Sequence, residues 1–185
     1  MTDIAVLDAS QVESTIRLAA GGDQAAFSQL VIEHHAAMSR VAYVIVGDVE
    51  AARDAVQSAW AIAWRRMSGL RQPQQVRSWL VAIAANEARQ HLRRQRRVTV
   101  VDLTEAIDRQ GSGDPAAFIG VVDLERALRK LQPDDRTLLA LRFVAGLDST
   151  EIAAHLGMSA SGVRSRLARL LDRLRTDLEP DGPRP

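Results

Sequence analysis

Apolar residues recur along most of this chain at intervals of three and four positions, the repeat of an amphipathic α-helix. The pattern predicts helices over residues 10–20, 24–46, 49–67, 76–97, 121–131, 134–146, 149–156 and from 159 onward. No segment shows the alternation of apolar and polar residues that is typical of a half-buried strand. The chain is therefore expected to be all-α.

The helical order breaks between residues 98 and 119. This segment clusters Gly111, Ser112, Gly113 and Pro115 behind a short apolar patch. We interpret it as a flexible acidic linker that joins two small helical domains. The expected organisation is an N-terminal domain at 1–97, the linker at 98–119, a C-terminal domain at 120–178 and a disordered tail at 179–185.

The composition excludes several classes of protein. With 46% hydrophobic and 25% charged residues, the balance is that of an ordinary globular chain. The absence of cysteine excludes disulfides, a thiol nucleophile and cysteine-ligated zinc. The first ten residues lack the basic start and apolar core of a signal peptide, and no apolar run approaches bilayer-spanning length. We expect a cytoplasmic protein with no membrane insertion of its own.

Charge is segregated along the chain, which the formal net charge of +1 conceals. Residues 86–97 carry five arginines against one glutamate, and residues 160–175 carry five arginines against one aspartate. Between them, residues 98–125 hold six acidic side chains against Arg109 alone. Arginine's planar guanidinium suits phosphates and guanine edges better than an ammonium does. The sequence therefore predicts two contacts with a polyanion, separated by an acidic segment.

The second basic segment belongs to a pair of predicted helices with the spacing of a helix-turn-helix. Such a unit needs a small residue where the helices cross, a turn residue that tolerates positive φ, and an apolar residue that fixes the second helix. Ala153, Gly157 and Val163 stand at these three places. The alternative is an ordinary helical hairpin, but a solvated face normally mixes charges, and this one is nearly all positive. The pattern favours DNA reading.

With these features together, the chain resembles the extracytoplasmic-function (ECF) sigma factors of bacterial RNA polymerase. Residues 48–64 are similar to the family's clamp-binding segment, and residues 76–94 to its segment for the promoter's minus-10 element. Residues 131–175 are similar to the C-terminal domain that reads the minus-35 element. The resemblance covers about residues 24–97 and 121–178, most of the chain.

The resemblance implies a transcription initiation factor, not an enzyme, with no cofactor or metal. Such a protein binds the RNA polymerase core through the clamp of the largest subunit and the flap of the second largest. It directs the core to specific promoter DNA and helps to melt the minus-10 region. An anti-sigma factor commonly controls family members, and we expect one here.

The resemblance also implies three sets of functional residues. For the minus-35 element they are Ser159, Ser161, Arg164, Ser165, Arg166, Arg169 and Arg173, with Arg166 and Arg173 expected on phosphates. For the minus-10 element they are Arg77, Asn86, Arg89, Gln90, Arg93, Arg94 and Arg97, together with the loop at 68–75. For polymerase binding they are Asp54, Gln57 and Trp60.

The chain departs from the family pattern at a few of these places. Arg53 and Ser58 stand where the family usually has glutamates, beside the retained Asp54 and Gln57. Ala85 replaces a usual arginine, Gln90 a usual aspartate and Gly162 a usual threonine. These departures bear on which promoter sequence is read and on the clamp contact, not on the class of function.

Two other classes remain as alternatives. An ordinary helix-turn-helix regulator would bind duplex DNA unaided, but it gives no role to the arginines of 86–97 or to the acidic segment. A helical adaptor that binds only protein would leave both sets of arginines as solvated surface.

Overall fold

The computed structural model describes residues 9–70, 72–101 and 119–178, which form helices and their connections with no strand among them. In chain order these are α1 (Ala9–Ala20), α2 (Gln24–Val46), α3 (Val49–Arg66), the 3-10 turns η1 (Met67–Gly69) and η2 (Pro73–Gln75), α4 (Val76–Val101), α5 (Ile119–Lys130), α6 (Pro133–Leu139), the π-helical turn η3 (Ala140–Val144), α7 (Ser149–Leu156) and α8 (Ala160–Leu178). The predicted all-α class is confirmed. Helix α4 continues beyond residue 97, and residues 102–118 and 179–185 lie outside the described part of the chain.

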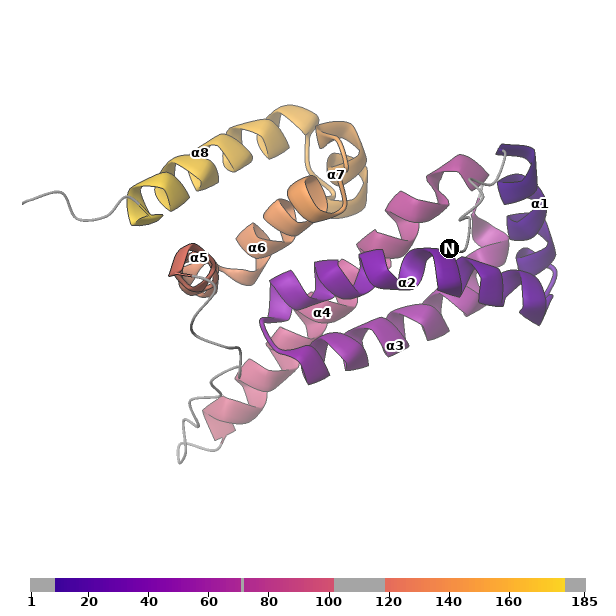
Figure 1. Cartoon of the computed structure of the whole chain (residues 1–185), viewed down its shortest axis with the longest axis horizontal. Coiled ribbons are helices and arrows are strands. Elements are labelled where there is room, and N and C mark those ends of the chain that lie inside the picture. Colours follow the sequence, from indigo (N-terminus) through magenta and orange to yellow (C-terminus); the bar gives the residue numbers. More distant parts are fainter. Residues whose placement is uncertain (1–8, 71, 102–118, 179–185) are drawn as a thin grey trace, which may run out of the picture.

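Helices α2, α3 and α4 pack together as an N-terminal bundle, and α1 lies against α2 and the turns η1 and η2 (Figure 1). The large side chains of this core are fully buried: Leu30, Met38, Ile45, Val56 and Leu80. Helix α3 instead buries a row of alanines: Ala51, Ala52, Ala55, Ala59 and Ala63. Because interaxial distance depends on the side chains at the contact, these small residues let α3 approach its neighbours closely.

The ends of α2 and α3 are set by the residues that the sequence indicated. The Ala26 amide donates to the Asp23 side chain at 2.8 Å, and the Ala51 amide donates to the Asp48 side chain at 2.8 Å. Gly47 between the two helices has φ 75°, a left-handed conformation that favours glycine. Each such cap is worth about 1 kcal/mol.

The C-terminal helices surround a second group of buried side chains, which includes Leu138, Leu141, Ile152, Val163 and Leu170. The predicted single helix over 134–146 is wrong in its second half. After Leu139 the ladder widens to a π turn, in which the Ala145 amide donates to the Ala140 carbonyl at 3.0 Å. The turn leaves Leu141 buried and Phe143 59% exposed. A side-chain bond from Arg142 Nη1 to the Leu147 carbonyl, at 3.0 Å, secures the segment that follows.

Helices α7 and α8 form the predicted helix-turn-helix. Asp148 and Glu151 make a capping box at the start of α7, since each side chain accepts a bond from the other residue's backbone N–H. Gly157 has φ 66°, so the turn does require a residue that tolerates positive φ. Ala153 and Val163 are both buried, which fixes the crossing of the two helices.

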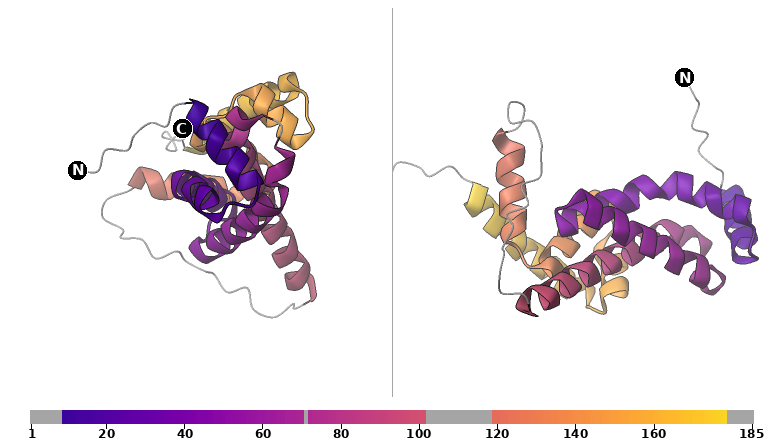
Figure 2. Two further views of the ribbon diagram at one scale, coloured as in Figure 1. Left: turned by 90° about the vertical axis from the view of Figure 1, so that its right-hand side faces the viewer. Right: turned by 90° about the horizontal axis from the view of Figure 1, so that it is seen from below.

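The two groups of helices are packed against each other (Figure 2). Helix α2 contacts α6 and η3, and α4 contacts α6, η3 and α7. Buried apolar residues of both parts form one continuous cluster. At this contact Arg136 of α6 is buried, and its Nη1 lies 4.0 Å from the place that a Cβ on Gly47 would occupy. The hydrophobic pattern did not predict this packing.

Candidate nucleic-acid interface

Helix α8 separates an apolar face from a polar one, as its sequence predicts. Val163, Leu167, Leu170 and Leu174 are buried against the rest of the C-terminal helices. The Gly162 amide donates to Ser159 Oγ at 3.0 Å, so Ser159 caps the helix. The side chains left exposed are Ser161, Arg164, Ser165 and Arg169. These four are free of the core and stand on the face that a DNA groove could meet.

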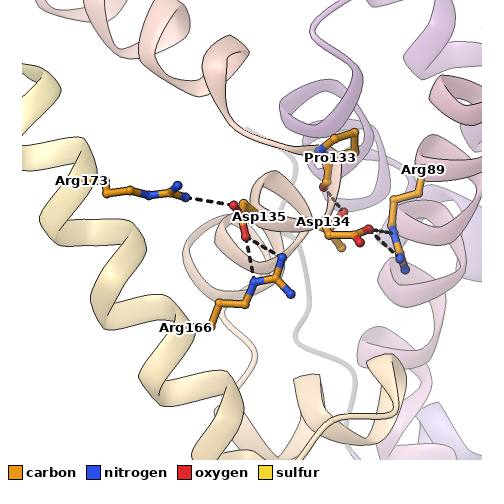
Figure 3. A network of polar contacts seen from close by, with 7 residues as sticks. Arg89, Pro133, Asp134, Asp135, Arg166 and Arg173 are labelled. Atoms are coloured by element: carbon orange, nitrogen blue, oxygen red, sulfur yellow. Dashed lines mark hydrogen bonds and ion pairs between the residues drawn. The ribbon is translucent and has the colours of Figure 1, made fainter. Parts of the chain in front are cut away.

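Two other arginines of α8 bind a carboxylate of α6 (Figure 3). Asp135 accepts from Arg166 Nε at 2.8 Å and from Arg173 Nη2 at 3.0 Å, and Arg166 Nη2 also lies 2.7 Å from the same Oδ1 as Arg166 Nε. The Asp135 side chain is only 10% exposed, whereas those of Arg166 and Arg173 are 36% and 58% exposed. Both guanidiniums therefore fasten α8 to α6 while keeping part of their surface in solvent.

The polar face of α4 divides into two rows. Asn86, Gln90 and Arg94, spaced four residues apart, line one wall of a groove of about 660 Å³. Arg65 and Arg66 of α3 line the opposite wall. The further lining residues are Ser58, Ala61, Ile62, Trp79, Ala82, Ile83, Glu87 and His155. The groove thus combines amide side chains, an indole surface and three arginines, a set suited to a nucleic-acid base and its phosphate.

The second row of α4, Arg89 and Arg93, faces the C-terminal helices. Arg89 Nε and Nη2 lie 2.8 and 2.7 Å from Asp134 Oδ1 on α6 (Figure 3). Arg93 lines a cavity of about 270 Å³ together with Leu92, Pro133, Asp134 and Arg166. The structure therefore does not bring all of the predicted minus-10 residues together.

Three predicted residues lie apart from both rows, and one cannot be placed. Arg77 is exposed in the first turn of α4. On α3, Asp54 and Gln57 are exposed, whereas Trp60 is half-buried: its Nε1 donates to His35 Nδ1 at 3.2 Å, and its ring meets Phe27 edge-on at 5.6 Å. The side chain of Arg97 lies outside the described part of the structure.

Two histidines near these surfaces are shifted toward the neutral form. Burial holds the pKa of His155 below its ordinary value, against the opposing effect of Glu151. Burial also lowers the pKa of His34 in the N-terminal core, where Arg77 lowers it further and Glu33 opposes. His34 Nε2 is buried with no hydrogen-bond partner, so a proton there would lack an acceptor.

Sequence reasoning missed Asp134, Asp135, Arg65, Arg66 and His155. The adjacent aspartates follow Pro133 and look like ordinary acidic residues in the first turn of a helix. Their partners are 31 to 45 residues away, and no local pattern points to them. Arg65 and Arg66 did carry a signal, because they extend the basic composition to the end of α3.

In the described segments, no helix has the length and hydropathy that crossing a bilayer requires. No group of three or more histidine, aspartate or glutamate side chains there could hold a metal ion.

Two helical domains that each present arginines on a helix face define a DNA-binding protein with two separate reading surfaces, and comparison with known proteins names the class. A family model described as Sigma-70 region 2 matches residues 30–98, and one described as Sigma-70, region 4 matches residues 122–174. The ECF RNA polymerase sigma-E factor of Escherichia coli K12 is 32% identical over 174 residues, which is 86% of this chain and 90% of that protein. The chain belongs to the ECF sigma factors of RNA polymerase.

Two further comparisons agree. The probable RNA polymerase sigma factor RfaY of Xanthomonas campestris pv. campestris is 34% identical over 168 residues; this is 86% of the present chain, which spans only 42% of RfaY. The solved structure of CnrH, in complex with the cytosolic domain of CnrY, has a TM-score of 0.65 and 28% identity, covering 91% of this chain and 97% of that one.

Proposed function

We propose that this protein binds core RNA polymerase, directs it to specific promoters and helps to melt the minus-10 region. The observation that carries the proposal is the pair of separate arginine-bearing surfaces, one on α8 of the region 4 match and one beside the α3–α4 groove of the region 2 match. A polymerase subunit needs two such readers because two promoter elements must be recognised at once. The corresponding domains are 1–97 and 120–178, joined by the segment 98–119.

For the minus-35 element, α8 is the recognition helix in the major groove. Arg164 and Arg169, with Ser161 and Ser165, are exposed and face away from the core, which supports a role at base edges. One bidentate arginine–guanine contact discriminates between bases by about 1–3 kcal/mol. Arg166 and Arg173 keep enough exposed surface to reach phosphates as well as Asp135.

For the minus-10 element, the α3–α4 groove is the candidate site for an extruded base of the non-template strand. Trp79 offers a stacking surface, and the amides of Asn86 and Gln90 can donate and accept at a base edge. Arg65, Arg66 and Arg94 supply positive charge for the backbone. Extruding a base costs a few kcal/mol, and binding in such a site offsets that cost, so melting needs no hydrolysis or other enzymatic step.

Protein partners contact other surfaces. Exposed Asp54 and Gln57, with Trp60 beside them, are the candidates for the polymerase clamp, and the C-terminal domain for the flap. An anti-sigma factor is a further partner, and the solved complex of CnrH with the cytosolic domain of CnrY supports it. These roles belong in the cytoplasm, where polymerase and chromosome are.

The test is reconstitution with core RNA polymerase, followed by sequencing of transcript starts. We expect starts at a defined set of promoters, and Asn86→Ala should reduce promoter opening more than duplex binding. Strong binding of the isolated protein to promoter duplex, with no effect on polymerase, would instead identify an ordinary helix-turn-helix regulator. Binding to polymerase that leaves the starts non-specific would identify an adaptor.

A further inference from the structure

Two neighbouring carboxylates on α6 bind arginines from both of the proposed DNA-reading helices. Asp134 holds Arg89 of α4, and Asp135 holds Arg166 and Arg173 of α8 (Figure 3). All three arginines belong to the sets assigned above to the two promoter elements. The carboxylates thus occupy groups that would otherwise be available to phosphates.

The two pairings differ in what they connect. Asp135 and its arginines are all within the C-terminal helices, and the carboxylate is nearly buried. Arg89 and Asp134 are 45 residues apart in the chain and connect the two domains. The side chain of Asp134 is 49% exposed and that of Arg89 is 21% exposed, so water and salt reach this pair.

The same packing affects the groove. His155, on α7 of the C-terminal domain, is among the groove's lining residues, beside those of α3 and α4. A base that entered the groove would therefore meet the C-terminal domain in this arrangement. The ion pair and the obstruction lie on the same helix, since Arg89 is one residue from Gln90 of the groove wall.

We propose that Asp134 is a latch that stands in for a DNA phosphate: by binding Arg89 it holds the free protein closed, with the C-terminal domain over the minus-10 groove. The proposal rests on the function proposed above, since it assumes that Arg89 and the groove bind DNA. DNA and Asp134 compete for one guanidinium, so DNA binding opens the two domains. Binding is weaker while the latch is closed, and this limits contact with DNA before polymerase is engaged.

The test measures the distance between the domains in the full-length protein. Because the chain has no cysteine, fluorophores can be attached to cysteines introduced at exposed positions, Ala36→Cys on α2 and Thr176→Cys on α8. Asp134→Asn should raise the ratio of open to closed molecules about two- to fivefold, as expected for a partly exposed ion pair. The charge-swapped variant Arg89→Asp with Asp134→Arg should return the ratio toward that of the parent.

The matched control is Asp172→Asn, which removes one carboxylate from the same domain at a site paired only with Arg175 of its own helix. It should leave the ratio unchanged. An unchanged ratio in Asp134→Asn overturns the latch, and so does equal opening in both variants, because the effect would then be general charge.

Competition is tested by adding single-stranded DNA of mixed sequence. We expect DNA to open the parent and Asp134→Asn to need a lower DNA concentration. Binding without opening, or with equal affinity in both variants, overturns the competition. Promoter-specific transcription with core polymerase is measured separately. If it persists while the distance test fails, only the latch is wrong; if transcription is absent, the proposed function is wrong.

Discussion

Replacing Asp135 by asparagine should destabilise the protein through the loss of a single buried charge. The carboxylate takes part in three contacts of 2.7–3.0 Å with two guanidiniums. A hydrogen bond to a charged group contributes about 1.5–3 kcal/mol to stability, but three such terms would overstate the loss. Arg166 and Arg173 are partly exposed and would regain water, and asparagine keeps one oxygen acceptor. Asp135 also lies in the first turn of α6, where a negative charge is favourable by about 0.3–1 kcal/mol.

The expected loss is therefore about 2 kcal/mol, which for a chain of 185 residues is a fall in Tm of about 4–8 °C. Thermal and urea unfolding followed by circular dichroism measure it. Asp172→Asn is the control, because this side chain is 74% exposed and 3.6 Å from Arg175, so its loss should cost less than about 0.5 kcal/mol. Equal losses in the two variants, or no loss in Asp135→Asn, would refute the reasoning.

Three other changes give separate tests. Asp54→Arg with Gln57→Ala should weaken binding to core polymerase in a pull-down titration without lowering helicity, because both side chains are exposed; unchanged affinity would remove this surface from the interface. Arg164→Ala should lose about 1–3 kcal/mol of discrimination at one upstream base pair, measured with single-base promoter variants, whereas a uniform loss across variants would mean a backbone contact. Burial puts the pKa of His34 in the folded protein below its ordinary value of 6.5, so the unfolded chain takes up the proton first. Stability should then fall as pH drops below about 7, and His34→Leu should flatten that fall. His155, shifted in the same direction, remains in both proteins, and parallel pH profiles would contradict the assignment to His34.

The local structure was predictable where one residue type performs one local task. The range of α2 follows from its apolar spacing between Asp23 and Gly47, and the structure has the same bounds. The helix-turn-helix follows from Ala153, Gly157 and Val163, because a small, a left-handed and an apolar residue are each needed at one place.

The contacts between distant segments were not predictable in this way. A periodic pattern shows that a helix has an apolar face but not which helix covers it, so the packing of α2 on α6 is absent from the pattern. The arginines of α4 looked like one polar face, yet Arg89 and Gln90 turn toward different partners because the C-terminal domain covers one side. Nor could the apolar spacing of 134–146 distinguish an α turn from a π turn, since both bury Leu139 and Leu141.

The π turn at Ala140–Val144 makes chain length, at this point, a determinant of orientation. A π turn holds one residue more than an α turn, and one residue corresponds to about 100° of rotation about the helix axis. Deleting a single residue between Leu139 and Gly146 would restore a regular ladder and rotate everything that follows, including α7 and α8, relative to α6. Asp135 would then no longer be aligned with Arg166 and Arg173. Among homologous chains, substitutions should accumulate in this segment far more readily than insertions or deletions.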